Sequence, residues 1–312
     1  MKITSLIENT SQRGLPVEHG LSLYIESGGK HILFDMGQSA LFAENAERLG
    51  VSIRDVDVAV ISHGHYDHGG GLQTFLSLNE KAKVYIHQKA FEPHYSLRDT
   101  GLRYIGLKQE LMEQRFCPPI TGEPKGVKRP LKQSQACLNY AESRRKKTEG
   151  QLKDEERLVF CQKKTEIDND MILFAGVTGC CCRPVGNRLL FGPAENVNDD
   201  FCHEQNLIIR EGDKTVLFAG CAHNGIVNIL QKATEQTGTA PTHVLAGMHL
   251  VKSGLSEAEE DAFIAKLAAE LMKYDNTQFY TMHCTGETGY NKLKATMGAQ
   301  IEYLSCGDKI KL

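Results

Sequence analysis

Four potential metal ligands lie within six residues of the sequence, which reads HGHYDH from His63 to His68. Imidazole and carboxylate groups are the side chains that bind zinc and related cations. His63 and His65 are separated by one glycine and can converge on one cation where the backbone turns. Asp67 and His68 then project elsewhere from the same loop, which suits a second cation nearby. The segment predicts a dinuclear metal site, with Asp67 and His68 also serving as catalytic residues.

One loop cannot supply all the ligands that two cations need. Three further histidines, His223, His249 and His283, each follow an apolar segment that is predicted to form a strand. Sheets of α/β proteins bind their ligands beyond the carboxyl ends of strands. We therefore expect His223 and His283 to bind metal, whereas His249 could bind either metal or substrate. Asp35 also ends a predicted strand, and a buried carboxylate there would hold the ring N–H groups of metal-bound histidines.

Strands and helices alternate along most of the chain, which is typical of an α/β fold. The predicted strands include residues 21–25, 31–35, 57–62, 83–87, 171–175, 206–210, 215–219, 242–246 and 278–282. The predicted helices include residues 39–49, 72–78, 225–233 and 256–274. The last predicted strand covers residues 301–304.

The composition is that of an ordinary folded protein. The 312 residues are 41% hydrophobic and 24% charged, with a formal net charge of −3. These values exclude a disordered chain and argue against general nucleic-acid binding by bulk electrostatics. No apolar run is long enough for a membrane span, and residues 1–8 lack the apolar core of a signal peptide. We therefore expect a cytoplasmic protein whose ten cysteines stay reduced.

A single domain spanning residues 1–312 is expected, with a basic insertion at about 117–168. Residues 121–164 contain twelve Lys or Arg against six Asp or Glu. A solvated, partly helical insertion and a docking surface for an acidic partner are both consistent with this composition. The consecutive cysteines at 180–182 are interpreted as ordinary thiols, with a separate metal site or a redox switch as the alternatives.

Candidate substrate ligands come from other segments. Arg98 and Arg103, with Lys108 beyond them, lie in a stretch expected to form a helical loop at the edge of the pocket. Their side chains could hold a phosphate or a carboxylate. His19 and His94 are further pocket candidates.

These motifs together resemble the metallo-β-lactamase superfamily of metal-dependent hydrolases, whose central His-x-His-x-Asp-His motif corresponds to residues 63–68. Further segments resemble the branch often labelled dihydropterin-methyl-ribofuranosyl-aminobenzene phosphate synthase. These segments are EHGLS at 18–22, ILFDMG at 32–37, GCAHNGI at 220–226 and HCTG at 283–286.

The resemblance implies an αββα four-layer sandwich, with two mixed β-sheets face to face and helices outside. It also implies one metal site formed by His63, His65 and His223, and another formed by Asp67, His68 and His283. His203 is an alternative to His223. Many relatives bridge the two cations with an aspartate from a Gly-Asp pair, but Cys221 occupies this position here. Either Cys221 supplies a thiolate or solvent alone forms the bridge.

The leading hypothesis is hydrolysis of a small, phosphorylated or ester-type substrate by a metal-bound hydroxide. Two divalent cations are expected, with zinc first and iron or manganese as alternatives. The alternative activities are a synthase or transferase acting on a methanopterin precursor and a redox diiron protein. A non-catalytic metal-binding scaffold or sensor is the alternative of another class. A small-molecule substrate is the expected partner, without nucleic acid or membrane, and a homodimer stays open.

Overall fold

The computed structural model describes residues 1–107, 154–194, 197–251 and 254–312. Its larger sheets each contain seven strands. The first has the order β17-β1-β2-β3-β4-β5-β8 and the second has the order β16-β15-β14-β13-β12-β10-β9. The first sheet is formed by β1 (Lys2–Ile7), β2 (Ser22–Ser27), β3 (Lys30–Phe34), β4 (Val58–Ile61), β5 (Lys83–His87), β8 (Leu158–Cys161) and β17 (Lys309–Lys311). The second is formed by β9 (Lys164–Glu166), β10 (Met171–Ala175), β12 (Gln205–Glu211), β13 (Lys214–Ala219), β14 (His243–Ala246), β15 (Gln278–Thr281) and β16 (Ile301–Tyr303).

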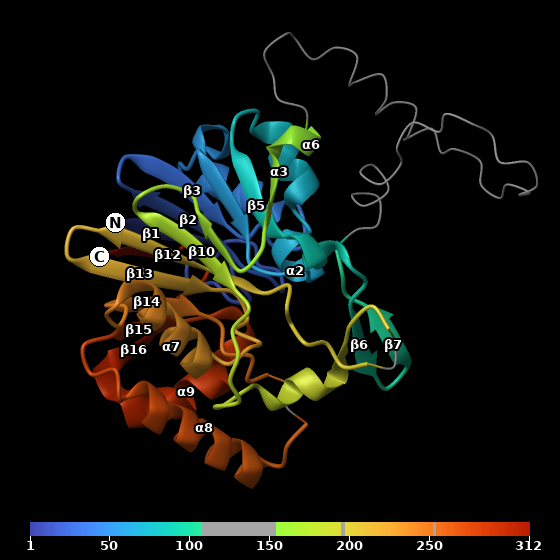
Figure 1. Ribbon diagram of the computed structural model, residues 1–312, viewed down its shortest axis with the longest axis vertical. Helices are drawn as coiled ribbons and strands as arrows, with labels where there is room; N and C mark the ends of the chain where they lie inside the picture. Colours follow the sequence, from blue (N-terminus) through green and yellow to red (C-terminus); the bar gives the residue numbers. More distant parts are fainter. Residues whose placement is uncertain (108–153, 195–196, 252–253) are drawn as a thin grey trace, which may run out of the picture.

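Helices cover the outer faces of the two sheets, with α3 on one side of the molecule and α7, α8 and α9 on the other (Figure 1). The α-helices are α1 (Leu41–Arg48), α2 (Tyr66–Gly69), α3 (Leu72–Leu78), α6 (Asp154–Arg157), α7 (Ile226–Thr237), α8 (Glu257–Leu271) and α9 (Gly286–Met297). Short 3-10 helices are η1 (Ile53–Asp55), η2 (Gln88–Phe91), η3 (Val185–Leu189), η4 (His283–Thr285) and η5 (Gly298–Gln300). None of the described helices is both long enough and apolar enough to span a bilayer.

The apolar strands build this layered arrangement because successive side chains point to opposite faces of a sheet. In β3, Phe34 packs between the two sheets, whereas Leu33 packs beneath the helices of the first half. In β13, Phe218 packs between the sheets and Leu217 contacts the helices of the second half. The rings of Phe34 and Phe218 meet across the interface with centroids 5.9 Å apart. Three apolar layers thus join four layers of secondary structure, which confirms the expected αββα sandwich.

Strands β3, β4 and β5 run parallel in the first sheet, and β13, β14, β15 and β16 run parallel in the second. Parallel strands end at the same edge of a sheet. The loops that follow β3, β4, β13, β14 and β15 are the segments in which the sequence places its candidate ligands.

Three local expectations need correction. The last strand is β17, which pairs with β1 and brings the two chain ends together, so residues 301–304 do not close the fold. The segment expected as a helical loop contains a hairpin of β6 (Tyr95–Arg98) and β7 (Gly101–Tyr104), because these residues pair in a small sheet with β11 (Leu190–Phe191).

The third correction concerns the insertion, whose C-terminal part belongs to the sheets. β8 extends the first sheet by pairing with β5, and β9 pairs with β10. Arg157, counted with the solvated basic residues, is 1% exposed. Its guanidinium donates to the carbonyls of Leu76, Asn79 and Ala82, at and beyond the end of α3. Residues 117–153 of the expected insertion lie outside the described residues.

Candidate metal centre

The six predicted metal ligands meet at one edge of the two sheets. The loop after β4 and the start of α2 carry His63, His65, Asp67 and His68, while the second sheet contributes the loops of His223 and His283. All six side chains are buried, with residue exposures between 0% and 7%. Burying so many polar groups is costly unless each has a partner. Their packing therefore points to a functional site.

The first group consists of His63, His65 and His223. His63 Nε2 lies 3.0 Å from His65 Nδ1, and one ligand atom from each residue falls within 4.8 Å of the others. His223 Nε2 is buried and has no hydrogen-bond partner among the described residues. Two nitrogen atoms about 2.0–2.1 Å from a tetrahedral zinc ion are about 3.3 Å apart. The spacing within this group suits a shared cation.

The second group consists of Asp67, His68 and His283. His68 Nε2 lies 3.2 Å from His283 Nε2, and Asp67 Oδ2 lies 3.4 Å from His283 Nε2 and 3.9 Å from His68 Nε2. These separations are close to those expected for atoms that share one cation.

In four of these histidines, a side chain bound to Nδ1 directs the ring so that Nε2 points toward the other ligands. The pairs are His63 with Ser62 Oγ at 2.9 Å, His68 with Asp35 Oδ2 at 2.6 Å, His223 with Asn187 Oδ1 at 2.9 Å and His283 with Asn9 Oδ1 at 3.0 Å. Metal-ligating histidines almost always bind a polar partner through their other ring nitrogen. Together with the partnerless Nε2 of His223, this pattern shows that the residues fit a metal centre.

The electrostatics of the site favour the ligating protonation states. Burial, aided by the neighbouring histidines, holds the pKa values of His63, His65 and His223 well below the ordinary 6.5. Burial also opposes ionisation of Asp67, but His68 and hydrogen bonds from His19 and His283 lower its pKa well below the usual range. The first group is therefore neutral at pH 7 and Asp67 is charged.

His68 behaves differently from the other imidazoles. Burial lowers its pKa, but the carboxylates of Asp35 and Asp67 outweigh that effect and raise the pKa overall. Asp35 also accepts hydrogen bonds from the backbone N–H and the hydroxyl of Ser62, at 2.7 and 2.8 Å. The geometry therefore gives Asp35 the holding role expected of it.

Two buried glutamates that the sequence did not single out hold the loops of the second sheet. Glu8 accepts the backbone N–H of His283 at 2.7 Å, and Glu204 accepts the backbone N–H of His223 at 2.6 Å. Asn9 and Asn187, which hold the rings of the same histidines, were also missed. Glu8 and His283 are 275 residues apart in the chain, so no local spacing could have indicated the pair.

Several residues in these loops have strained backbone conformations. Asp35, Ala222, His249 and His283 have φ angles of 59°, 54°, 46° and 53°, a region that residues other than glycine rarely adopt. Such conformations persist only where the surrounding structure fixes them, and they cluster at functional sites. The strain is therefore further evidence that this edge of the sheets is specialised.

A cleft opens over the two groups. Its lining includes His19, Arg98, His249 and Cys221 together with His65, Asp67, His223 and His283. His19 Nε2 lies 3.2 Å from Asp67 Oδ2, and the Nε of Arg98 is buried without a partner among the described residues. His249 packs against His223 with ring centroids 4.4 Å apart, and its Nδ1 is also buried and without a described partner. The cleft thus contains donors that could bind a substrate.

Two other substrate candidates lie elsewhere. The guanidinium of Arg103 is 5.9 Å from the ring centroid of Tyr66, on an exposed part of β7, and Arg103 does not line the cleft. His94 is 1% exposed and is bonded to Asp199. Arg103 lies on the exposed hairpin outside the cleft, whereas His94 lines a second pocket together with Asp199 and His203. Lys108 lies outside the described residues.

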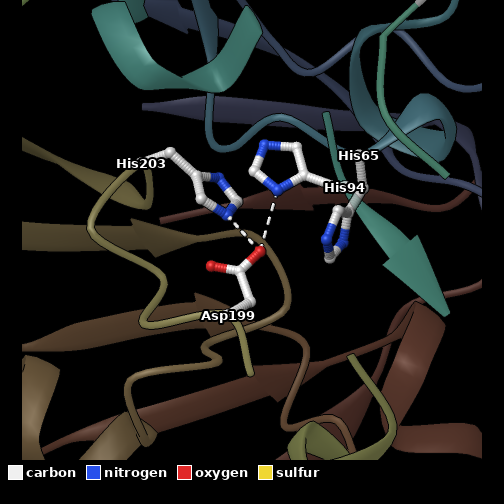
Figure 2. Close-up of side chains that lie close together, drawn as sticks. All are labelled: His65, His94, Asp199 and His203. Atoms are coloured by element: carbon white, nitrogen blue, oxygen red, sulfur yellow. Dashed lines mark hydrogen bonds and ion pairs between the residues drawn. The ribbon is translucent and has the colours of Figure 1, made fainter. Parts of the chain in front are cut away.

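His94, Asp199 and His203 form a hydrogen-bonded cluster beside His65 (Figure 2). His94 Nδ1 and His203 Nε2 lie 2.8 and 3.1 Å from Asp199 Oδ2, and His203 Nδ1 accepts the backbone N–H of Gly64 at 3.0 Å. Burial raises the pKa of Asp199, but the hydrogen bonds from His203 and His94 hold it far below its usual range. The ligand atom of His203 thus lies in a set with His65, His94 and Asp199, whereas that of His223 lies in a set with His63 and His65, so the geometry favours His223 as the third member of the first group.

The comparisons with known proteins agree with this fold and site. The family model of the metallo-β-lactamase superfamily matches residues 15–150. The crystal structure of Tm1679, a metal-dependent hydrolase of the β-lactamase superfamily, superposes with a TM-score of 0.72 at 28% identity, covering 100% of this chain and 99% of that one. Residues 15–150 thus match the metallo-β-lactamase superfamily, and the whole chain has the fold of that superfamily.

Two curated relatives come from Methanocaldococcus jannaschii. The uncharacterized protein MJ0448 is 30% identical over 295 residues, which is 93% of each chain. The 7,8-dihydropterin-6-methyl-4-(β-D-ribofuranosyl)-aminobenzene-5'-phosphate synthase is 25% identical over 327 residues, covering 100% of this chain and 96% of the relative.

Within this metallo-β-lactamase fold, the cysteines occupy different environments. Cys221 and Cys284 are buried beside the ligand groups, and burial raises the pKa of the Cys221 thiol well above its ordinary value. The consecutive cysteines pack against the segment that follows His223, where the Asn228 side chain donates to the carbonyl of Cys181 at 2.9 Å. Cys180 is exposed, whereas Cys182 packs in the core beneath the helices of the second half, with its Sγ 3.9 Å from that of Cys181.

Proposed function

We propose that this protein is a metal-dependent hydrolase with two divalent cations, one held by His63, His65 and His223 and the other by Asp67, His68 and His283. The observation that carries the proposal is the shared orientation of four imidazoles, whose Nδ1 atoms are held by Ser62, Asp35, Asn187 and Asn9 while Nε2 points inward. A donor set of histidine and carboxylate suits zinc, and also iron or manganese.

When bound, such cations lower the pKa of water to about 7 and polarise a carbonyl or phosphoryl oxygen. The chain's own residues would position the substrate. His19 donates to the Asp67 carboxylate at the cleft and keeps it oriented, while Asp35 keeps the ring of His68 in place. The unpartnered Nε of Arg98 can donate to an anionic or carbonyl oxygen of a small substrate in the cleft.

Elemental analysis of the purified protein tests this proposal. The wild type is expected to contain about two equivalents of zinc, iron or manganese, as two metal sites require. His65→Ala and His283→Ala should each lose about one equivalent, because each removes a ligand from a different group. His31→Ala is the matched control, since His31 lies in β3 away from the cleft. A wild-type protein that binds no metal after reconstitution would overturn the proposal.

Activity is tested on the same proteins with phosphodiester, lactone and thioester substrates. Hydrolysis should need metal and should fall strongly in His65→Ala and His283→Ala, but not in His31→Ala. The variants must stay folded by circular dichroism for the comparison to count.

A synthase-type reaction at the same centre is the second candidate. It is favoured by the relative named a synthase, which matches this chain from end to end. Turnover in ¹⁸O-labelled water separates the two. A hydrolase incorporates one labelled oxygen into its product, whereas joining two substrates does not.

A further inference from the structure

Cys221 lies where the two groups of ligands meet. It directly follows the Ala219-Gly220 end of β13 and is 3% exposed. Its Sγ falls within 4.8 Å of ligand atoms in both groups, in one set with His63 and His68 and in another with His223 and His249. A third such set joins it to His283 and Cys284.

Backbone packing fixes this position. Gly220 lies so close to Ser62 that a Cβ there would collide with the Ser62 hydroxyl, and it would also lie 3.3 Å from His63 Nδ1. The absence of a side chain therefore lets the end of β13 approach the loop after β4. That close approach brings the Cys221 thiol from the second sheet into contact with His68 of the first.

Two ring nitrogens and one sulfur atom, each able to donate an electron pair, face one another around His68. His68 Nε2 lies 3.2 Å from Cys221 Sγ and 3.2 Å from His283 Nε2. The Nδ1 atoms of His68 and His283 face Asp35 and Asn9, so both rings direct Nε2 inward. A proton between the two nitrogens serves that contact only, whereas a divalent cation accepts electron pairs from both nitrogens and from sulfur.

Cys284 provides the contrast. It is as deeply buried as Cys221, at 2% exposure. Its Sγ accepts the backbone N–H of His249 at 3.2 Å and lies 3.7 Å from the carbonyl oxygen of Cys221. Cys284 Sγ thus has two backbone contacts and shares a set with His283 of the second group, whereas Cys221 Sγ shares sets with His63 and His223 of the first group as well.

We propose that Cys221 is a thiolate ligand of the metal centre, placed between the two cations. The inference rests on the proposed function, because it needs the cations to bind. Ligation breaks the S–H bond, forms a sulfur–metal bond and releases one proton to solvent. A thiolate ligand favours zinc and other thiophilic cations over magnesium or calcium.

Cobalt(II) substitution tests the proposal by spectroscopy, without measuring activity. Cobalt bound to a thiolate shows a sulfur-to-cobalt charge-transfer band in the near ultraviolet, which nitrogen and oxygen ligands do not give. The wild-type protein should show this band, Cys221→Ser and Cys221→Ala should lose it, and Cys284→Ala should keep it. Each titration should also report how many cobalt equivalents bind.

Cys221→Asp provides a further variant for the case that Cys221→Ser and Cys221→Ala do not fold. It replaces the thiolate by a carboxylate, so it should bind cobalt without the band. A wild type that binds two cobalt equivalents without the band overturns the role of Cys221 but leaves the proposed function intact. A band that survives in the folded Cys221 variants, or disappears in Cys284→Ala, also overturns it. A wild type that binds no cobalt and no zinc overturns both proposals.

Discussion

Four of the five ligand imidazoles are oriented by a side chain that binds the other ring nitrogen. Asp35 shows this most clearly, because one buried carboxylate binds His68 Nδ1 and both the N–H and the hydroxyl of Ser62. Ser62 in turn lies 2.9 Å from His63 Nδ1. One acidic residue therefore orients a ligand of the second group directly and a ligand of the first group through Ser62.

Asp35→Asn is expected to weaken binding at the second group by about 10- to 100-fold, the usual cost of losing such a partner. The amide has one acceptor oxygen in place of two and carries no charge to hold the His68 ring. Metal titration against a competing chelator measures the affinity. Asp57→Asn is the control, because Asp57 bonds the backbone of His31 and pairs with Lys81 just before β4, away from the site. Equal affinities in wild type and Asp35→Asn would contradict the prediction.

Loops and the short helices α2 and η4 carry the ligands, so these segments must be fixed by their neighbours. The Asp199 cluster in Figure 2 links two neighbouring segments to the loop after β4. Asp199 binds His94 from the segment before β6 and His203 from the segment before β12. His203 then accepts the N–H of Gly64 between two ligands. The cluster therefore stabilises the loop after β4.

Asp199→Asn should lower the free energy of unfolding by about 1–3 kcal/mol, because one ring N–H of the buried cluster loses its acceptor. Urea unfolding of the metal-free protein measures this change. Asp200→Asn is a matched control, since Asp200 is the next residue, is exposed and accepts hydrogen bonds from the N–H and the thiol of the nearby Cys202, outside the cluster. Unfolding of both variants at the same urea concentration would show that the cluster does not stabilise the protein.

Close packing of the same loop gives a second prediction for this element. A Cβ at residue 64 would collide with the carbonyl oxygen of Ala90 and lie 2.7 Å from His94 Nε2. Gly64→Ala should therefore cost about 1–3 kcal/mol, as overpacking usually does, and should displace His63 and His65. Thermal unfolding and metal content are the measurements. Gly192→Ala has room for its Cβ, whose nearest neighbour would be Asp199 Cα at 3.8 Å, and should be close to wild type in both.

At the scale of the whole molecule, the site exists only when the two sheets are packed together. The first sheet supplies His63, His65, Asp67 and His68, while His223 and His283 come from the second. The apolar layer between the sheets, which includes Phe34 and Phe218, sets the distance between these contributions. Stability of the fold and assembly of the site are therefore linked.

The metal-free protein should lose stability in mild acid. His63, His65 and His223 have pKa values well below 6.5 in the folded state, mainly because they are buried. As the pH falls below about 6.5, the unfolded chain therefore binds more protons at these residues than the folded protein does. The free energy of unfolding decreases as a result. His68 has a raised pKa and opposes this trend, because it stabilises the fold at low pH and stops doing so as the pH rises through its folded pKa.

Three residues outweigh one, so the expected net effect is a loss of stability between about pH 6.5 and pH 5. Urea unfolding at several pH values, with a chelator present, provides the measurement. Each extra proton bound by the unfolded state contributes about 1.4 kcal/mol per pH unit. Stability that stayed constant or rose toward pH 5 would show that the three imidazoles are not buried in neutral form.

Residue spacing and apolar runs in the sequence predicted those parts of the structure that depend on residues close together in the chain. The HGHYDH segment and the strand ends before His223 and His283 could be read directly, because they combine short spacing with apolar runs. The β6–β7 hairpin, β17 and β8 were missed or misplaced. These strands are short, and β17, β8 and β6 each pair with a strand that is distant in the chain. The same reason explains why Glu8, Asn9, Asn187 and Glu204 gave no signal.

The sequence by itself determined the donor atoms, the strands they follow and the layered α/β class, because each of these depends on residues close together in the chain. Only the tertiary structure decided that His223 rather than His203 has a free ring nitrogen facing the first group. Only it placed the Cys221 thiol 3.2 Å from His68 Nε2, across the junction of the two sheets. These distances are set by packing between segments about 150 residues apart, and no periodicity in the chain encodes such packing.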